Sequence, residues 1–505
     1  MENRPQWGTR AGFILAAAGS AIGLGNIWRF PATAFENGGG AFFLPYLFAL
    51  LTAGIPLLIM EFTLGHKYRG SAPLTYARLN RKTEWLGWWQ VAISFVISVY
   101  YAVIIAWAMS YAVFSFKLSW GKDTEGFLFG DYLKLAETPG QTGSIVPHVL
   151  IPLIIVWIVT LGVLLKGIKK GIEAANKVFL PTLCVLFLII VLRAVTLDGA
   201  VEGLNAFFKP NWDVIFDGKV WVSAYGQIFF SLSIAFAIMV TYSSYLPKKS
   251  DITNNAFITG FANSGFELLA GIGVFSILGF MAKQQGVGVD EVVSGGVGLA
   301  FVVFPQIINE FPAFNEFFGF LFFTSLVLAG FTSLISIVET FVAGVQDKFG
   351  VSRTKSVLIG GGLASVLSLL FATQGGLHFL DVVDYFINSF GVTMAGLVEV
   401  IIIAWVFKEL KNLQQHADSV SDMMLGAWWR ICLSVVTPVV LGYMMFDNIK
   451  TNIAENYGGY STAFVVSSGW VVAGAVLLVG LILSTAKWKK ETVNNVSSQN
   501  KGAAS

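Results

Sequence analysis

The residues most able to do chemistry lie inside a segment that should be purely apolar. The run from Gly19 to Pro31, GSAIGLGNIWRFP, places three glycines, Asn26 and Arg29 within the first apolar stretch of the chain. Backbone that leaves a helix at membrane depth must be satisfied by protein, water or ions. The run therefore predicts a helix that breaks at a binding site.

Ionisable side chains inside apolar segments indicate a polar pathway through the protein. Because burying a charge in a membrane is costly, such residues mark function by default. For any one of them, a structural ion pair or a carboxylate at a backbone break is the alternative, but a cluster over many segments favours the pathway. The residues are Arg29, Glu61, Glu267, Glu339, Asp384 and Glu399.

Neutral oxygen ligands form a second group. Gln227–Ser233, Asn263 and Ala329–Ser333 bring amide, hydroxyl and carbonyl oxygens into three further apolar segments. A hard monovalent cation such as sodium suits several weak oxygen ligands better than thiolate or imidazole. Hydrogen bonding between helices is the favoured explanation for any single one of these residues. Sodium binding is therefore predicted only from their combination with the broken first segment.

Ligands for softer metals are sparse. Cys184 and Cys432 both fall in apolar segments and are interpreted as small buried hydrophobes. No nucleophile, metal triad or phosphate-binding loop suggests an enzyme, and the four histidines are too scattered in sequence to suggest a ligand cluster. These histidines are His66, His148, His378 and His416.

The elements that must position these residues are membrane spans. The 505-residue chain is 55% hydrophobic, only 12% charged and has a mean hydropathy of +0.71, far too apolar for a soluble protein of this size. A net charge of +2 without a basic domain excludes nucleic acid as a partner. Stretches of about 20 apolar residues predict twelve spans, near 11–36, 41–65, 87–116, 148–166, 172–195, 220–245, 255–282, 318–346, 356–373, 381–407, 425–447 and 463–486.

The distribution of Lys and Arg predicts the orientation. One set of loops (66–86, 166–170, 247–251, 347–355 and 408–424) holds fifteen Lys and Arg, whereas the longer opposite loops hold seven. The positive side faces the cytoplasm, so both termini are predicted to be cytoplasmic. Among the outer loops, 283–317 is too apolar for a bare loop. A lid that folds back and short helices packed on the outer surface remain equally good interpretations.

The motifs resemble the signature of one family. The run Gly19–Pro31, followed by Glu36–Phe42 and Gly54–Leu57, is similar to the neurotransmitter:sodium symporter family, whose bacterial members include LeuT, and the similarity extends to Asp384. It implies an all-α polytopic membrane protein with the LeuT fold: twelve transmembrane helices, a 5+5 inverted repeat plus two helices, and helices 1 and 6 discontinuous. The implied parts are a cytoplasmic segment 1–10, repeats 11–195 and 220–407, helices 11 and 12 at 425–486, and a disordered cytoplasmic tail 487–505.

The sixth span fits this pattern less well than the first. Where the family often has glycines, this chain has Ala235 and Ala237, which weakens the case for a break there and trims the pocket. In the fifth span, Gly171 and Pro181 resemble a family motif that lets this helix unwind towards the cytoplasm.

The resemblance also implies two sodium sites and a substrate site. The first sodium would be held by Ala21, Asn26, Ser231 and Asn263 with the substrate carboxylate, and the second by Gly19, Ile22, Ala329, Thr332 and Ser333. Amides near Leu24 and Gly25, together with the Tyr101 hydroxyl, would receive the carboxylate of an amino acid, for which Gly23 leaves room. The rest of the implied substrate site is Ala21, Ile97, Phe230, Ser231, Ser233, Phe236, Ser333 and Ile337.

Charged and aromatic pairs match the family's gates. Arg29 and Asp384 would close the outside above Tyr101 and Phe236. The cytoplasmic closure would comprise Arg4, Trp7, Tyr245 and Asp347. Glu267 stands where chloride-dependent relatives have a neutral residue, which predicts that no chloride is needed. Proton counter-transport through Glu267 is a further hypothesis.

The predicted function is sodium-coupled import of a neutral, hydrophobic L-amino acid by alternating access through the inner (plasma) membrane. A sodium-independent or proton-driven carrier of the same fold is one alternative. A channel or a non-transporting receptor is another, although paired charges at both gates favour alternating occlusion. The predicted partners are the amino acid and the lipid bilayer. The amino acid, the sodium stoichiometry and the choice between monomer and homodimer stay open.

Overall fold

The computed structural model describes residues 4–489, and these are almost entirely helical. Ten helices are long and apolar enough to cross a membrane, and one bent pair, Arg10–Ala21 with Leu24–Glu36, makes an eleventh. A further helical pair on either side of residues 232–237 occupies the sixth predicted span. Within the described residues the only β-type pairings are the isolated bridges Gly39–Pro210 and Ile145–Thr373.

Long aliphatic runs form helices here because a helix satisfies its own backbone in lipid. The first five spans are α1 (Arg10–Ala21), α2 (Leu24–Trp28) and α3 (Phe30–Glu36); α4 (Phe43–Ala49), η2 (Leu50–Gly54) and α5 (Ile55–Tyr68); α7 (Glu84–Phe114); α9 (Pro147–Leu165); and η6 (Ile168–Glu173) with α10 (Ala174–Ala194). The next five are α12 (Gly218–Ser231) and α13 (Ile238–Ser243); α14 (Ile252–Gln285); α18 (Asn315–Phe349); α19 (Arg353–Ser356), η9 (Val357–Gly361) and α20 (Gly362–Leu367); and α21 (Gly376–Phe386), η11 (Ile387–Val392) and α22 (Thr393–Ile401).

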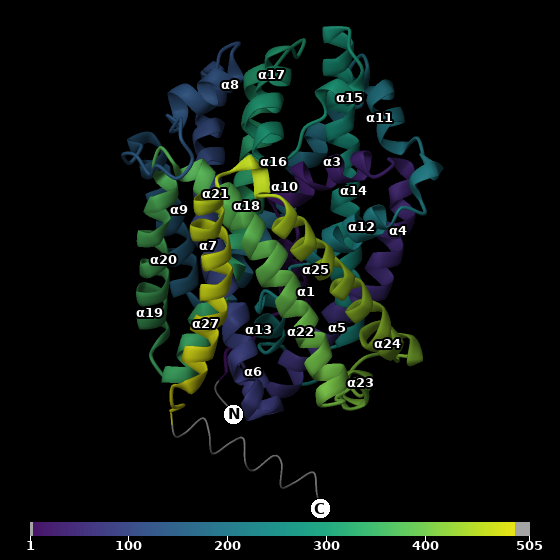
Figure 1. The fold of residues 1–505 in the computed structure, drawn as a ribbon, viewed down its shortest axis with the longest axis vertical. Coiled ribbons are helices and arrows are strands. Elements are labelled where there is room, and N and C mark those ends of the chain that lie inside the picture. The colour runs from purple at the N-terminus through teal and green to yellow at the C-terminus, as the bar shows by residue number, and fades with distance from the viewer. Residues whose placement is uncertain (1–3, 490–505) are drawn as a thin grey trace, which may run out of the picture.

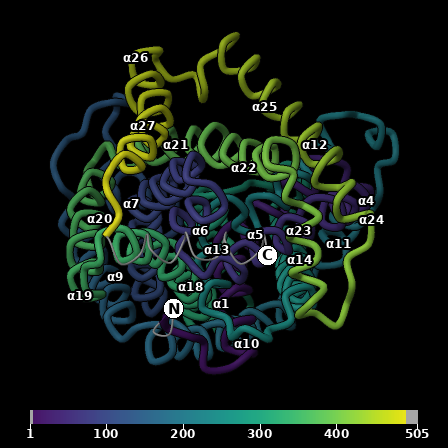
Figure 2. The backbone as a smooth tube through the Cα atoms, turned by 90° about the horizontal axis from the view of Figure 1, so that it is seen from below, coloured from purple at the N-terminus to yellow at the C-terminus, as the bar shows by residue number. Residues whose placement is uncertain are grey.

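The last two spans lie at the edge of the bundle. They are α24 (Ala427–Ile431), η13 (Cys432–Val436) and α25 (Thr437–Ala454), then α26 (Thr462–Val465), η15 (Val466–Trp470) and α27 (Val471–Thr485). Figure 2 shows them on the rim, with α1, α5, α13 and α18 nearer the middle. In α7 and α18, 83% of the most apolar window is buried inside the protein, against 28% in the last span, so these two helices form the core.

Both ends of the described chain lie at one end of the bundle, which we call the N-terminal face (Figure 1). The short helices α6 (Ala72–Leu79) and α23 (Leu410–Asp418) cover this face. The opposite face carries α8 (Thr124–Gly126), α11 (Ala200–Phe208), α15 (Val289–Val292), α16 (Gly296–Gly298) and α17 (Phe304–Asn309). The apolar loop 283–317 therefore forms short helices, and Gly296 and Val297 line the central cavity described below.

The residues that follow α27 are packed against the N-terminal face. Trp488 is only 6% exposed, and its indole nitrogen donates to Glu84 Oε2 at 2.7 Å. The ring also lies 4.7 Å from the Lys348 ammonium, whose side chain is fully buried and paired with Glu84. The predicted disordered tail thus begins with ordered residues, and its remainder, 490–505, lies outside the described residues.

Candidate functional site

The first span breaks between α1 and α2. The two halves, Arg10–Ala21 and Leu24–Glu36, meet at 54°, and Ile22 and Gly23 are extended. A Cβ on Gly23 would stand 3.0 Å from Ser333 Oγ and 3.1 Å from the Tyr101 hydroxyl. Glycine at this position therefore keeps open the space between the break and these two hydroxyls. The Leu24 N–H, at the start of α2, reaches the Tyr101 hydroxyl at 3.4 Å.

The sixth span also breaks, despite its alanines. Between α12 and α13 the backbone is left-handed at Ser233, Ala235 and Ala237, with φ of 53°, 64° and 61°. For a residue with a Cβ this conformation costs about 1–2 kcal/mol. Hydrogen bonds from other spans offset it: Glu61 Oε1 accepts from the Ala235 N–H at 2.7 Å, and Ser94 Oγ donates to the Phe236 carbonyl at 2.6 Å.

Glu61 therefore fits the alternative given for it above, a carboxylate at a backbone break, and it does not line the central cavity. Glu399, the other buried carboxylate in this part of the bundle, accepts from Gln90 Nε2 at 2.9 Å. Glu399 does not line the central cavity.

A cavity of about 240 Å³ lies between the two breaks. This is smaller than the pockets of about 300–1,000 Å³ that hold drug-sized ligands. Its walls include every residue predicted to bind substrate: Ala21, Gly23, Leu24, Gly25, Ile97, Tyr101, Phe230, Ser231, Ser233, Phe236, Ser333 and Ile337.

The cavity also has walls that sequence reasoning missed, among them Ser20, Tyr100, Ile104 and Leu380. One of them, Ile104, could have been predicted from its spacing along a helix. Ile97, Tyr101 and Ile104 follow each other at intervals of four and three residues on α7, so they share one helix face.

The side chains predicted for the first sodium meet beside this cavity. Asn26 Nδ2 donates to Asn263 Oδ1 at 2.8 Å and to Ser231 Oγ at 3.3 Å, and Asn263 Nδ2 donates to Ser231 Oγ at 2.7 Å. All three side chains are buried. Three neutral polar side chains from α2, α12 and α14 therefore converge. The Asn263 amide oxygen and the Ser231 hydroxyl oxygen meet there, and both are ligand types suited to a monovalent cation.

Ser231 also contacts Glu267, which is fully buried. The Ser231 hydroxyl and Gln227 Nε2 each donate to Glu267 Oε1 at 2.7 Å, and the Tyr46 hydroxyl donates to Glu267 Oε2. Three donors therefore hold this carboxylate in place. The arrangement places a buried carboxyl group next to the predicted first sodium site.

The residues predicted for the second sodium join α1 to α18. Thr332 and Ser333 direct their hydroxyl protons to the Ala329 carbonyl, at 2.9 and 3.3 Å, which leaves oxygen lone pairs available for a cation. Ser333 Oγ also lies 3.3 Å from the Ser20 carbonyl oxygen. A Cβ on Gly19 would be 3.4 Å from Thr332 Cβ, so the two helices approach closely here.

The two predicted gates are in different states. Arg29 and Asp384 line the same cavity but form no ion pair within 4.0 Å among the described residues. The Arg29 guanidinium lies over the Phe230 ring at 4.7 Å, and Asp384 accepts from the Tyr100 hydroxyl at 2.6 Å and from Asn388 Nδ2 at 2.9 Å. The gate at the opposite face is not engaged.

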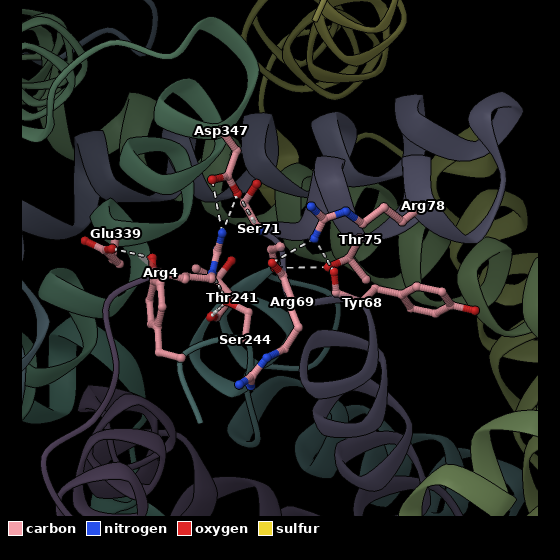
Figure 3. Close-up of polar contacts among 12 residues, drawn as sticks. Arg4, Tyr68, Arg69, Ser71, Thr75, Arg78, Thr241, Ser244, Glu339 and Asp347 are labelled. Atoms are coloured by element: carbon pink, nitrogen blue, oxygen red, sulfur yellow. Dashed lines mark hydrogen bonds and ion pairs between the residues drawn. The ribbon is translucent and has the colours of Figure 1, made fainter. Parts of the chain in front are cut away.

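The gate at the N-terminal face is closed (Figure 3). Arg4 Nη1 donates to both carboxylate oxygens of Asp347, at 3.0 and 3.1 Å. The Ser71 N–H donates to the same carboxylate at 2.8 Å. The Arg4 guanidinium also lies 5.0 Å from the centre of the Tyr245 ring. Trp7 donates from its backbone to the Tyr245 carbonyl at 3.1 Å and from its indole to the Tyr242 carbonyl at 2.8 Å.

Glu339, which the sequence singled out without a role, supports this gate. Its fully buried carboxylate accepts from the Tyr245 hydroxyl at 2.8 Å and pairs with Arg353 at 2.6 Å. Arg353 lies beyond the end of α18, so its part in the pair could not be predicted from helix spacing.

Two histidines also meet near the N-terminal face. His66 Nδ1 and His416 Nε2 lie 2.9 Å apart, although 350 residues separate them in sequence. Within residues 4–489 no group of three or more His, Cys, Asp or Glu could hold a metal ion.

Known proteins are similar to this chain in sequence and in fold. A family model described as the sodium:neurotransmitter symporter family matches residues 4–131 and 122–491. A sodium-dependent transporter of Methanocaldococcus jannaschii is 41% identical over 484 residues, covering 96% of this chain and 98% of the relative. The human sodium- and chloride-dependent GABA transporter 2 is 31% identical, covering 88% of this chain and 80% of the relative.

One solved structure has the same fold. The crystal structure of MhsT in complex with L-phenylalanine aligns with a TM-score of 0.75 and 31% sequence identity, covering 88% of this chain and 99% of MhsT. The predicted all-α membrane fold of the LeuT type is thereby confirmed.

Proposed function

We propose that this chain, which belongs to the sodium:neurotransmitter symporter family, imports a neutral, hydrophobic L-amino acid together with sodium by alternating access. The family consists of sodium-coupled transporters and not of enzymes, and this chain is a sodium-dependent transporter that spans the membrane many times. The observation that carries the proposal is the cavity between the two helix breaks, with apolar walls on one side and non-helical backbone and hydroxyls on the other.

The walls of the cavity support the choice of substrate. Ile97, Phe230, Phe236 and Ile337 offer apolar contacts to a side chain. The start of α2 offers N–H groups to a carboxylate, and Gly23 leaves the space for it. MhsT, whose structure holds L-phenylalanine, supports the same class of substrate.

Two sodium sites would link the ion gradient to the substrate. At the first site all protein ligands are neutral, so an anionic substrate oxygen strengthens sodium binding and sodium strengthens substrate binding by the same factor. The second site, where α1 meets α18, would hold the first span against the core. With about 100 mV and a tenfold sodium gradient, two ions supply roughly 7 kcal/mol per cycle. This suffices for about a 10⁵-fold gradient of a zwitterion.

The gates support alternating access. The Arg4–Asp347 pair closes the N-terminal face while Arg29 and Asp384 are apart, as expected for a protein ready to bind from the opposite face. We place the N-terminal face in the cytoplasm, because its loops hold most of the Lys and Arg. The membrane would be the inner, or plasma, membrane.

Glu267 supports independence from chloride. Its carboxylate already supplies a negative charge to the Tyr46, Gln227 and Ser231 donors. Replacing Glu267 by Ser should make sodium-dependent binding require chloride, tested by exchanging chloride for gluconate. If binding by Glu267→Ser were equal in both anions, this part of the proposal would fail. Proton return through Glu267 predicts that uptake into vesicles depends on internal pH, and uptake indifferent to that pH would overturn it.

The experiment that tests the whole proposal is a thermal-shift screen of L-amino acids in sodium and in choline. A hydrophobic amino acid should raise the unfolding temperature in sodium and not in choline. Stabilisation of equal size in both salts would indicate a sodium-independent carrier. Uptake into vesicles that tracks a proton gradient instead would indicate a proton-driven carrier.

A further inference from the structure

A fully buried asparagine in the fifth span has no role in the sites described so far. Asn176 lies near the start of α10 and is 0% exposed. Its Nδ2 donates to the Ile172 carbonyl at 2.9 Å. Its Oδ1 has no hydrogen-bond partner among the described residues. An unpaired buried acceptor costs about 1–3 kcal/mol of folding stability. A ligand bound to this oxygen would offset that cost.

The unpaired oxygen lies against Gly19, a residue of the predicted second sodium site. Asn176 Oδ1 lies 2.6 Å from the place where a Cβ on Gly19 would stand, and Thr332 Cβ lies 3.4 Å from that same place. Gly19 and Thr332 are both residues of the second site. Asn176 thus brings an amide oxygen from a third helix to the junction of α1 and α18.

The orientation of the amide follows from its donor. With the amide reversed, Oδ1 would face the Ile172 carbonyl oxygen, and two acceptors would meet without a proton between them. The arrangement found instead gives Nδ2 to Ile172 and leaves an acceptor facing Gly19. A neutral amide oxygen is a suitable ligand for a hard cation, and the hydroxyls of Thr332 and Ser333 leave lone pairs available at the same junction of α1 and α18.

We propose that Asn176 is a ligand of the sodium ion at the second site, supplied by the fifth span. The inference rests on the proposed function, because that function supplies the ion. Asn176 also connects the ion to η6 (Ile168–Glu173), because its other amide atom holds the Ile172 carbonyl of that turn. Sodium bound at Oδ1 fixes the side chain and so stabilises η6.

The connection reaches the start of α1. Glu173, the last residue of η6, accepts from the Gly8 N–H at 2.6 Å and from the Thr9 hydroxyl at 2.9 Å. The η6 turn therefore holds the N-terminal end of the first span. Loss of sodium from Asn176 loosens η6 and, through Glu173, this hold on α1.

The test is a sodium titration of the unfolding temperature of the purified full chain. Amino acid is omitted, since the first site lacks a ligand without it, and choline keeps the ionic strength constant. Asn176→Ala should raise the half-saturating sodium concentration about tenfold. Asn176→Asp, measured at alkaline pH, should lower it, because a carboxylate attracts the ion more strongly. A purely structural asparagine would change stability equally in sodium and in choline.

Asn255→Ala is the matched control. Asn255 is also a fully buried asparagine with one unpaired atom, but that atom is the donor Nδ2, which cannot hold a cation. The Asn255→Ala variant should have the same half-saturating sodium concentration as the wild type. As a second readout, sodium should slow amide hydrogen exchange in residues 168–173 of the wild type, and Asn176→Ala should remove most of this protection.

The outcomes separate the two proposals. If the wild type shows no sodium-dependent stabilisation, the proposed function fails. If the wild type responds and Asn176→Ala responds within twofold of the same sodium concentration, only the inference about Asn176 fails. Should Asn176→Ala not fold, Asn176→Asp decides: a lowered half-saturating concentration supports the inference, and an unchanged or raised one overturns it.

Discussion

Removing Arg4 should open the N-terminal face of the protein. Arg4 joins Asp347 through two hydrogen bonds, at 3.0 and 3.1 Å, and donates to Ser244 Oγ at 3.1 Å. In Arg4→Ala, Asp347 keeps only the Ser71 N–H among these partners. The closed state should therefore lose free energy relative to the open state.

The exposure of the pair sets the size of the effect. Both side chains are 18% exposed, between the exposed pairs that contribute about 0.2–1 kcal/mol and the buried pairs whose disruption costs about 3–5 kcal/mol. We expect about 2 kcal/mol, which is about a 30-fold shift towards the open state. Under the proposed function, amino acid binds when the N-terminal face is closed. The apparent affinity for amino acid should therefore fall in proportion to the population of the closed state that is lost.

The assay is amide hydrogen exchange in the segment 5–16, measured in sodium without amino acid. Exchange should accelerate about 30-fold in Arg4→Ala if opening exposes these amides. Arg10→Ala is the control, because Arg10 is 52% exposed and lies 3.7 Å from Asp251. Because the Arg10 side chain of this pair is half-exposed, its loss should limit the change to about fivefold. Equal exchange in the two variants would refute the assigned role of Arg4.

Three further predictions concern other parts of the molecule. Gly23→Ala should weaken amino-acid binding about tenfold or more, since its Cβ would enter the space beside Ser333 and Tyr101, whereas Gly265→Ala, with no atom within 4 Å of its Cβ, should bind normally. Burial, and then the neighbouring His66, lower the pKa of His416 to about 4. Because an unfolded histidine titrates near about 6.5, stability should fall as pH drops from about 6.5 to about 4, and His416→Gln should flatten that part of a plot of unfolding temperature against pH. Trp488→Ala should cost about 3–5 kcal/mol of stability, and Trp488→Phe less. Trp212→Ala, at a side chain that is 55% exposed, should leave the unfolding temperature nearly unchanged; a fall equal to that of Trp488→Ala would contradict the packing described for Trp488.

The first helix break could be predicted from sequence, whereas the second could be predicted only by resemblance. The local sequence predicts the first break, because it contains Gly19, Gly23 and Pro31. At Ala235 and Ala237 the local preference opposes the observed backbone, and the bonds that hold it come from Glu61 and Ser94 on other spans. Such tertiary bonds cannot be deduced from local propensity.

At the substrate cavity and the gates, too, some features could be predicted from the sequence and others could not. The residues predicted to bind substrate all line the cavity, but Gly296 and Val297 enter from an outer loop without a recognisable spacing. The partnership of Glu339 with Arg353 depends on how the chain turns after α18. The burial of Trp488 depends on contacts with residues more than 100 positions earlier in the chain. These features depend on contacts between distant segments, which spacing along one helix does not encode.

The contact between Trp488 and Glu84 also constrains how the protein is made. Glu84 enters the membrane bundle early, with the third span, but its indole partner is 404 residues further along the chain. During synthesis the buried pair of Glu84 and Lys348 stays uncovered until Trp488 has emerged. A chain that stops before Trp488 would carry every predicted binding residue and still lack the cover over this pair. The residues that follow α27 thus complete a buried contact that the earlier spans leave open.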